Sequence, residues 1–403
     1  MTQEEATGPS RECDHVELPV TRQVASSIPD WTSPVLVVQH VRPDTAAFIQ
    51  VLLEANIKVS TVVAIPYSSD DACVAKLSDS VRMLCPGLDE MSATAAAEVR
   101  ALSQQDGRRV VVQDVGGYFA DALRGDPTLG ASIRGIAEET KQGLWRYRNL
   151  ENCQFPVVQI ADSRLKQIEA RYVGAAVALS ALEATRCIGN ASIGERIAVV
   201  GYGDIGAACA RTVRGIANTV YIWDTDPIQR IAAAADGFMI ATPEEIVGNC
   251  RLIIGCTGKE SVGQEWFADV SGDYYLASGS SRDIEFRRLL NWGAGRSQDY
   301  TISQYARRVP VTRIDLDLGR LHVLRGGLPI NFESASLPYD IIDLVFAQLL
   351  VAMVEVELGD EVGLRGLSDD GQHGIASAWL STHGATGHAS IRNDFAKYAV
   401  RPS

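Results

Sequence analysis

Apolar runs alternate with helix-like segments along the first part of the chain. Within residues 34–160 the strand-like runs are VLVVQH (35–40), KVSTVVAI (58–65), RRVVVQD (108–114) and PVVQI (156–160). A helix is predicted from Asp44 to Ala55. Strands that alternate with helices favour a parallel sheet with helices packed on it. These residues are therefore predicted to form one α/β domain.

A second alternation of the same kind begins at residue 196. Its strand-like runs are IAVV (197–200), VYIW (220–223), FMIA (238–241), LIIGCT (252–257) and YYLASGS (274–280). Helices are expected up to about Ile216 and over residues 228–235 and 243–247. The fold class is therefore α/β with two doubly wound parallel-sheet domains. Residues 168–186 carry small and apolar side chains at helical spacing and predict a hinge helix between the domains.

These patterns set the expected domain boundaries. The first domain comprises residues 21–167 and 338–362, and the second comprises residues 168–337. Residues 1–20 are acidic and polar, unlike a signal peptide, and are predicted to be a loose tail, as are residues 363–403. The most apolar segment, 341–358, contains two glutamates, an aspartate and a glutamine, which a bilayer would tolerate poorly. We predict a packed helix that returns to the first domain, and no membrane partner.

Composition narrows the function classes. The net charge of −13 argues against nucleic acid as a partner, because such proteins need clustered Lys and Arg. The eight cysteines form neither a CxxC pair nor a cluster with histidine, so no metal site is expected. Most of them are expected to be reduced residues of a cytoplasmic protein.

The turn Gly201-Tyr-Gly203-Asp-Ile-Gly206 joins a predicted strand to a predicted helix. Its first glycine permits a tight turn, its second lets backbone N–H groups approach a pyrophosphate, and its third lets helix and strand pack closely. Asp224 ends the next strand, 23 residues after Gly201. An acid there accepts hydrogen bonds from ribose hydroxyls and repels a 2′-phosphate, which favours NAD over NADP. The predicted cofactor residues of this segment are Gly201, Gly203, Asp204, Ile205, Gly206 and Asp224.

Two weaker cofactor predictions are made with their alternatives. Thr257 and Gly258 end a strand at the same predicted rim and are expected to line the cofactor, although a plain turn would have the same sequence. Asp224 could also be an ordinary surface carboxylate in a turn.

The chain resembles the S-adenosylhomocysteine hydrolase family over most of its length. The glycine turn followed by VYIWDTDPI is similar to that family's NAD segment. GIAEET (135–140) is similar to its Glu-Glu-Thr turn, and DSRLK (162–166) to its Asp-Ser-x-x-Lys segment. QDVGG (113–117) is similar to its Asp-Asp-Gly-Gly loop, VQH (38–40) to its first strand end, and GGLPIN (326–331) to its nicotinamide segment.

The resemblance implies an NAD-dependent enzyme that acts on a small-molecule nucleoside. That family oxidises the 3′-hydroxyl of the nucleoside, which acidifies the C4′ proton, and a 5′ leaving group then departs by elimination. The implied catalytic residues are Lys166 at the 3′-hydroxyl, His40 near the 5′ substituent and Glu139 at the ribose. Thr140 and Asp114 are implied substrate contacts, and Asn331 is implied to hold the nicotinamide amide. The resemblance also implies a homo-oligomer, a tetramer or a dimer.

Several positions depart from the family pattern, and they gather in the substrate segments. The sequence has Arg42, Val115, Ala170, Arg171 and Ser280 where the family has threonine, aspartate, aspartate, asparagine and histidine. A shifted alignment would let Glu169 replace the missing aspartate. We therefore count Arg42, Glu169, Arg171 and Ser280 as candidate substrate contacts. Buried ligand groups left without partners cost about 1–3 kcal/mol each, so a changed substrate is expected.

Three functions follow from these observations. The first is an NAD-dependent nucleoside lyase that removes water and leaves an unsaturated sugar, as nucleoside-antibiotic biosynthesis would require. The second is a divergent adenosylhomocysteinase, and the third is a non-catalytic NAD-binding regulatory subunit. A 2-hydroxy-acid dehydrogenase is disfavoured, because no histidine lies between residues 41 and 321 and only His322 could act as its acid.

Overall fold

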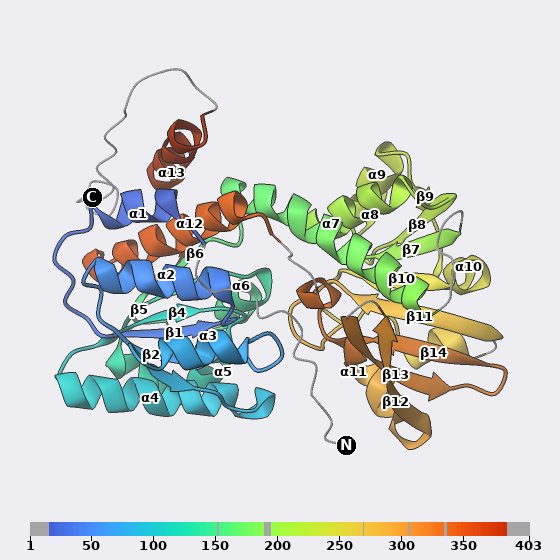
Figure 1. Ribbon diagram of the computed structural model, residues 1–403, viewed down its shortest axis with the longest axis horizontal. Coiled ribbons are helices and arrows are strands. Elements are labelled where there is room, and N and C mark those ends of the chain that lie inside the picture. Colours follow the sequence, from blue (N-terminus) through green and yellow to red (C-terminus); the bar gives the residue numbers. More distant parts are fainter. Residues whose placement is uncertain are drawn as a thin grey trace, which may run out of the picture. The chain divides into compact units, whose positions relative to one another are not determined.

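A computed structural model describes residues 16–150, 153–188, 195–268, 270–304, 307–333 and 337–384 (Figure 1). The described residues before Ile168 and after Pro338 form a first compact unit, and Ile168–Pro338 form a second. The chain enters the second unit inside helix α7 (Arg164–Cys187) and returns immediately before α12 (Tyr339–Leu358).

The first unit is built on a seven-stranded sheet in the order β15-β6-β5-β4-β1-β2-β3. All of its strand pairs are parallel. The strands are β1 (Val35–Gln39), β2 (Val59–Ala64), β3 (Arg82–Leu84), β4 (Val110–Asp114), β5 (Ile133–Glu138), β6 (Pro156–Gln159) and β15 (Gly363–Gly366). The strand order reverses between β1 and β4, the point where α/β sheets open a crevice for ligands.

Helices cover both faces of this sheet (Figure 1). α1 (Pro19–Ala25), α2 (Pro43–Glu54) and α12 lie on one face, and α4 (Met91–Asp106) and α5 (Tyr118–Gly125) lie on the other. The remaining helices are α3 (Asp71–Leu77), α6 (Lys141–Arg148) and α13 (Asp369–Thr382). Proline begins α1 and α2, where its missing N–H is not needed, and the Asp70 carboxylate caps α3.

Helix α12 is buried along nearly its whole length, and its polar residues have partners within the first unit. The Asp343 carboxylate accepts hydrogen bonds from the backbone N–H groups of Val20 and Thr21, both at 2.8 Å. Gln348 accepts one from the Ser163 hydroxyl at 2.5 Å. These bonds offset the cost of burying polar groups in the core. Among the described helices, none is long and apolar enough to cross a membrane.

The prediction of a tail from residue 363 is wrong as far as residue 382. Residues 363–366 form β15, which pairs with β6, and residues 369–382 form α13. The Ser368 hydroxyl caps α13, and Leu367 and Ile375 are buried. At the other end, Leu18 and Val20 are also buried, so the predicted N-terminal tail is too long. Residues 1–15 and 385–403 lie outside the described residues.

The second unit is built on an eight-stranded sheet in the order β12-β13-β14-β11-β10-β7-β8-β9. Its strands are β7 (Arg196–Val200), β8 (Thr219–Trp223), β9 (Met239–Ile240), β10 (Leu252–Gly255), β11 (Gly272–Ser278), β12 (Ser297–Gln304), β13 (Arg307–Asp315) and β14 (Gly319–Leu324). Six of these strands run parallel in the dinucleotide-fold order β9-β8-β7-β10-β11-β14. This arrangement confirms the predicted fold class.

The edge of the second sheet was not predicted. β12 and β13 pair with each other antiparallel, and β13 pairs antiparallel with β14. These strands carry many polar and charged residues and no uniform apolar run, so the sequence pattern did not separate them from loops. The helices of this unit are α7, α8 (Asp204–Arg214), α9 (Pro227–Ala235), α10 (Pro243–Asn249) and α11 (Arg287–Gly293).

Candidate functional site

The glycine turn of the second unit follows β7 and leads into α8. Gly201 has a φ of 95°, and a side chain there would place its Cβ 2.7 Å from the backbone of Cys256. A Cβ on Gly206 would lie 1.9 Å from the Gly201 carbonyl oxygen. Both glycines are therefore required by the close packing of α8 on the strands, as predicted for the first and third glycine of a dinucleotide turn.

Gly203 differs from these two glycines, because a Cβ there would meet no atom within 4 Å. The protein's own packing therefore does not explain the glycine, whereas a ligand that approaches the backbone would. Gly203 is also the N-cap of α8, and no side chain caps that end. Asp204 and Ile205 follow as the first residues of the helix. An uncapped helix N-terminus beside open space fits a pyrophosphate.

Asp224 lies beside this turn. Its Oδ2 accepts a hydrogen bond from the backbone N–H of Tyr202 at 2.7 Å, and its Oδ1 accepts one from Asp226 at 2.9 Å. These bonds fix the carboxylate next to the glycine turn, and each oxygen retains a second lone pair. The arrangement fits recognition of ribose hydroxyls.

A residue missed by the sequence analysis, Glu285, organises the neighbouring part of the rim. Its fully buried carboxylate accepts hydrogen bonds from the backbone N–H groups of Thr257 and Gly258, both at 2.7 Å, and from the Ser280 hydroxyl. Burial raises the pKa of Glu285, although these donors oppose the rise. The only signal in the sequence was a pair of acids, Asp283 and Glu285, after a Ser/Gly-rich turn.

Ser280 and Asn331 belong to this same rim. Ser280 also accepts a hydrogen bond from the Gly258 N–H at 2.9 Å, so it supports the cofactor loop. The assignment of Ser280 as a substrate contact stays a prediction. Asn331 is buried in the short 3-10 helix Ile330–Glu333, and Pro329 forms a bridge to Ser278 at the end of β11.

The first unit places Lys166 and Glu139 in an ion pair. The Lys166 Nζ lies 3.0 Å from the Glu139 Oε1, with the two side chains 13% and 14% exposed. Gln39 donates to the other oxygen of Glu139 at 3.1 Å. Burial alone would raise the pKa of Glu139, but the charge of Lys166, the Gln39 amide and the charge of His40 lower it overall. Glu139 is therefore a carboxylate at neutral pH.

His40 extends this cluster from the end of β1. Its Nδ1 lies 2.5 Å from the Ser68 hydroxyl, and its backbone N–H donates to the Gln39 amide oxygen at 2.9 Å. Tyr67 packs edge-on against the ring, with 5.7 Å between centroids. The structure thus brings the three predicted catalytic residues, His40, Glu139 and Lys166, into one cluster, which we call the Lys166–Glu139–His40 cluster.

Asp44 is a further member of this neighbourhood that the sequence analysis missed. It lies in the first turn of α2, and Arg42 occupies the N-cap position of that helix. Burial raises the pKa of Asp44, the charge of Glu139 raises it further, and the charge of Arg42 lowers it. Asp44 and Arg42 are therefore both within electrostatic reach of the cluster. An aspartate two residues after Arg42 was the available signal.

Asp114 and Thr140 serve the fold. Asp114 is fully buried and accepts hydrogen bonds from the Phe119 N–H at 3.0 Å and the Tyr147 hydroxyl at 2.7 Å. The Thr140 hydroxyl donates to Glu138 at 2.7 Å and caps α6 by accepting from Gly143. Both Asp114 bonds use Oδ2, and its buried Oδ1 has no partner among the described residues. The assignment of Asp114 and Thr140 as substrate contacts stays a prediction.

Glu138, the neighbour of Glu139, binds backbone N–H groups and has no lysine partner among the described residues. Its carboxylate accepts hydrogen bonds from the backbone N–H groups of Gly116 at 3.1 Å and Gly117 at 3.2 Å. Burial, and then the charge of Asp114, raise its pKa well above the ordinary value. Glu138 thereby holds the loop after β4 in place.

Two predicted substrate contacts lie on α7 beyond Lys166. Glu169 is 9% exposed. Arg171 is exposed and follows Lys166 by five residues, which turns its side chain by about 140° around the helix axis. The structure therefore does not bring Arg171 together with Lys166.

Gln113 is a fully buried amide on β4. Neither its Oε1 nor its Nε2 has a hydrogen-bond partner among the described residues. β4 lies between β1 and β5, and Gln113 pairs with Val37 and Ala137, two residues before Gln39 and Glu139. Since alternate residues share a face, Gln113 lies beneath the Gln39–Glu139 hydrogen bond.

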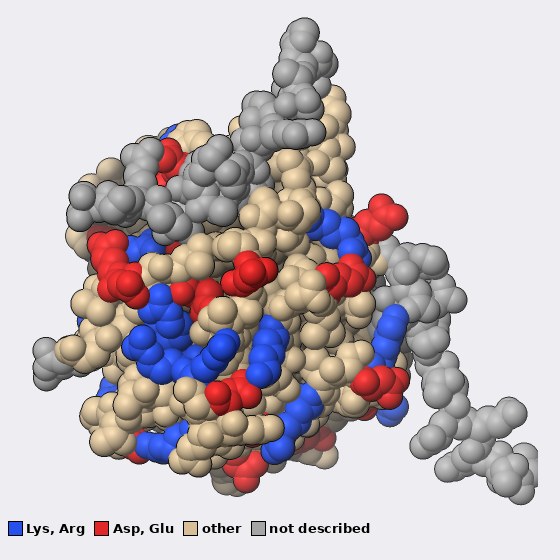
Figure 2. Space-filling view, turned by 90° about the vertical axis from the view of Figure 1, so that its left-hand side faces the viewer, with Lys and Arg blue, Asp and Glu red and all other residues tan. Residues whose placement is uncertain are grey.

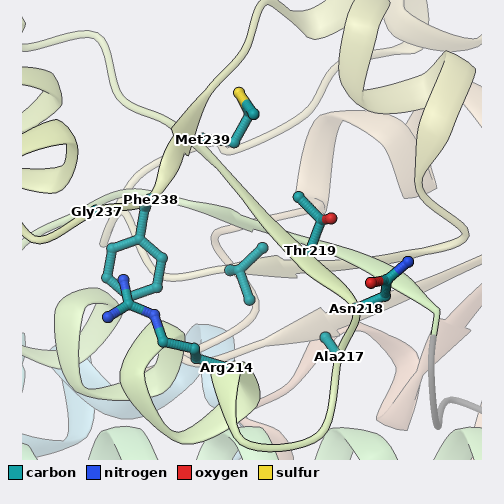
Figure 3. A pocket seen from close by; sticks show the side chains of 8 residues that line it. Arg214, Ala217, Asn218, Thr219, Gly237, Phe238 and Met239 are labelled. Carbon is teal, nitrogen blue, oxygen red and sulfur yellow. The ribbon is translucent and has the colours of Figure 1, made fainter.

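The second unit also has a hollow, which lies away from the glycine turn. A hollow of about 250 Å³ in the second unit is lined by Arg214, Thr219, Phe238 and neighbouring residues, at the sheet edge opposite the glycine turn (Figure 3). Its Arg214 already stacks on Phe238 and donates to the Asp236 carbonyl. No group of three His, Cys, Asp or Glu side chains that could hold a metal ion occurs among the described residues.

Cys73 is disulfide-bonded, and the six other described cysteines are free, in agreement with the prediction that most cysteines are reduced. On the face that Figure 2 shows, basic and acidic side chains are interspersed, without the broad basic surface that binds nucleic acid.

The sequence of the chain is similar to those of known proteins. Residues 181–278 match the family model "S-adenosyl-L-homocysteine hydrolase, NAD binding domain". The chain is 27% identical to an adenosylhomocysteinase from Pyrococcus abyssi, over 76% of this chain and 72% of that protein. It is 25% identical to one from Thermococcus kodakarensis, over 76% and 73%. A solved glyoxylate reductase from Paecilomyes thermophila is 10% identical with a TM-score of 0.39, covering 80% of this chain and 95% of that one.

The protein is thus a two-unit α/β protein whose second unit is an NAD-binding domain. It is similar to the S-adenosylhomocysteine hydrolase family, through the model of that family's NAD-binding domain and through the two adenosylhomocysteinases named above.

Proposed function

We propose that the protein is an NAD-dependent lyase that acts on a nucleoside and removes water from its sugar. The observation that carries this proposal is the Lys166–Glu139–His40 cluster, in which a lysine and a carboxylate form a largely buried pair. Such a pair provides a base and a hydrogen-bond acceptor in one place, as sugar oxidation and proton removal require.

The residues of the second unit fit NAD. Gly203 and the first turn of α8 would hold the pyrophosphate, and Asp224 would bind ribose hydroxyls. Thr257, Gly258 and Asn331 would line the nicotinamide end. When bound, NAD supplies reversible oxidation of a sugar hydroxyl.

The residues of the first unit supply the proton transfers. Lys166 would take the proton of the 3′-hydroxyl, and Glu139 would orient that ammonium and accept a bond from a sugar hydroxyl. The 3′ ketone acidifies the C4′–H bond, and the Glu139 carboxylate would accept the C4′ proton as the 5′ carbon–oxygen bond breaks. His40, held by Ser68, would protonate the departing oxygen to give water. As C3′ is reduced again, Lys166 would return its proton to the 3′ oxygen, which would complete the cycle.

A second candidate is hydrolysis of S-adenosylhomocysteine, which the names of the relatives favour. Two substitutions argue against this candidate, because Val115 and Ala170 replace aspartates of the family with side chains that have no polar group. Val115 packs in the apolar core beside α4 and α5, and Ala170 is an almost buried residue of α7. Groups of the substrate that the family's carboxylates would bind would then lack partners.

The test begins with the nucleotide that the purified protein carries. Release by denaturation should yield NAD and not NADP. The protein is then incubated with S-adenosylhomocysteine, adenosine and a panel of other nucleosides, while mass spectrometry follows loss of water and absorbance follows NADH. Water loss from a nucleoside supports the proposal, release of homocysteine at an enzymic rate establishes the second candidate, and inert NAD towards every nucleoside favours a regulatory subunit.

A further inference from the structure

Gln39, the last residue of β1, connects two members of the Lys166–Glu139–His40 cluster. Its side chain is buried, and the four residues before it in β1 are aliphatic and fully buried. Its Nε2 donates a hydrogen bond to Oε2 of Glu139 at 3.1 Å, and its Oε1 accepts one from the backbone N–H of His40 at 2.9 Å. Because a backbone N–H can only donate, the amide must direct its own N–H groups towards Glu139.

The Glu139 carboxylate therefore has a different donor on each oxygen. Its Oε1 lies 3.0 Å from the Lys166 Nζ, and its Oε2 accepts the hydrogen bond from Gln39. The terminal torsion of a glutamate is broad, so the ion pair alone would leave the plane of the carboxylate loosely set. The second donor, from another segment of the chain, fixes that plane. Gln39 thus orients the group that the proposed mechanism uses as its base.

Glu139 lies among charged and titratable groups from three elements. They are Lys166 of α7, His40 after β1, and Arg42 and Asp44 at the start of α2. Burial raises the pKa of the Glu139 carboxyl, but the charge of Lys166, the hydrogen bond from Gln39 and the charge of His40 lower it overall. Gln39 differs from the other groups because it carries no charge. Its effect therefore depends on one hydrogen bond.

We propose that Gln39 is a positioning residue, whose amide fixes the orientation of the Glu139 carboxylate beside His40 and donates to its charged form. An aliphatic side chain would suit the end of this apolar strand, and a buried amide costs free energy unless it is hydrogen-bonded. The two bonds to Glu139 and His40 therefore account for a glutamine at this position. Its effect on turnover rests on the proposed function, in which Glu139 takes the C4′ proton and His40 protonates the leaving oxygen.

The first test is urea unfolding of the full-length protein at pH 7 and at about pH 3, which requires no activity. Gln39→Met keeps a similar volume but removes the donor, and should raise the unfolding equilibrium constant at pH 7 about tenfold. The stabilising effect of the Glu139 carboxylate is present above its unfolded pKa of about 4.3 and is lost as the pH falls through the lower folded value. The tenfold factor should therefore become smaller at low pH.

A double-variant comparison separates this effect from packing. In a Glu139→Gln background no carboxylate accepts the Gln39 hydrogen bond, so Gln39→Met should change the unfolding equilibrium constant by a factor that is independent of pH. If the effect of Gln39→Met on the wild-type background is also independent of pH, and equal to that in Glu139→Gln, the glutamine only packs and the proposal is overturned.

Two further variants make the comparison specific. Gln39→Glu has the same shape but offers an acceptor in place of the donor, so at pH 7 it should raise the unfolding equilibrium constant more than Gln39→Met does. It supplies the same comparison if the methionine variant does not fold. Gln159→Met is the matched control, because Gln159 is also a buried glutamine at a strand end but accepts from the Asp162 N–H at 2.9 Å. Its effect should not depend on pH, and a pH dependence equal to that of Gln39→Met would contradict the proposal.

The second test is the pH dependence of turnover with a nucleoside that the protein converts. Gln39→Met should lower kcat about tenfold at pH 7 and shift the acid limb of the profile to higher pH, with KM and the NAD content unchanged. An acid limb that does not move would overturn the role in turnover, while the proposed reaction would stand. If no nucleoside is converted, the proposed function is wrong, and the unfolding comparison still decides whether Gln39 positions Glu139.

Discussion

The two units use the same strand order to hold two different kinds of site. In each sheet the order reverses beside the unit's first strand, between β1 and β4 in the first unit and between β7 and β10 in the second. After β7 comes a glycine turn whose backbone is proposed to hold the pyrophosphate, whereas after β1 come His40 and Arg42. The same position in the strand order therefore carries a proposed backbone site in one unit and a proposed side-chain site in the other.

The acidic residues of the two units show what this difference means. In the second unit Asp224 and Glu285 accept backbone N–H groups and so shape loops. In the first unit Glu138 does the same, but its neighbour Glu139 pairs with Lys166. Burial raises the pKa of Glu138, whereas the nearby positive charge lowers that of Glu139. Adjacent residues of one type can thus have opposite roles.

The largest expected effect is that of a Lys166 substitution, which should abolish the proposed reaction in the first unit without changing NAD binding in the second. Lys166→Met should lower nucleoside-dependent NADH formation by roughly 10³-fold or more, because the proton acceptor is lost. The NAD content after purification should stay at the wild-type level. The control is Lys141→Met, which removes an exposed ion pair with Asp162 and should change neither quantity. An unchanged NADH signal in Lys166→Met would remove this lysine from the mechanism.

Two glycine substitutions test the proposed NAD site at the glycine turn of the second unit. Gly206→Ala places a Cβ against the Gly201 carbonyl. It should lower the free energy of unfolding by about 1–3 kcal/mol and also weaken NAD binding. Gly203→Ala meets no protein atom, so its melting temperature without nucleotide should be unchanged while its NAD affinity falls. Calorimetry of both proteins measures the two effects. Undiminished NAD affinity in Gly203→Ala would contradict the proposed position of the pyrophosphate.

The ion pair predicts a pH dependence of stability. The pKa of Glu139 is lower in the folded protein than in the unfolded chain, so its contribution is present above the unfolded value of about 4.3 and is lost as the pH falls through the folded value. Glu139→Gln should cost about 1–3 kcal/mol at pH 7, because Lys166 loses its counter-charge. The difference in the free energy of unfolding between this variant and wild type, measured by urea unfolding, should become smaller at low pH. A difference that is the same at pH 3 and pH 7 would argue against the pair.

The smallest effect concerns the buried amide beneath the cluster. Gln113→Leu removes two polar atoms without partners and keeps a similar volume, so it should stabilise the first unit by about 1 kcal/mol. Thermal unfolding measures this change, with Gln159→Leu as the control. Gln159 accepts a hydrogen bond from the Asp162 N–H at 2.9 Å, so that substitution should destabilise. Destabilisation by Gln113→Leu would show that the amide has a partner in solution.

Patterns of short range were predicted correctly from the sequence. The alternation of apolar runs and helices predicted both parallel sheets, because burial on both faces leaves a continuous apolar signal. The polar edge strands β12 and β13 lack that signal, and so does α13, whose cap at Ser368 was overlooked. The hydrogen bonds of Asp114 to Tyr147 and of Thr140 to Glu138 were not predicted, because a motif does not say which way a side chain points.

The sequence by itself determined the two α/β units, the glycine turn and its acid, because these depend on backbone conformation and on residues near one another in the chain. Only the tertiary structure decided which acids have structural roles and which one pairs with Lys166. Glu139, Lys166 and Gln39 meet from three separate segments of the chain. Their pKa values and hydrogen bonds depend on burial and on neighbours distant in sequence, which no local pattern encodes.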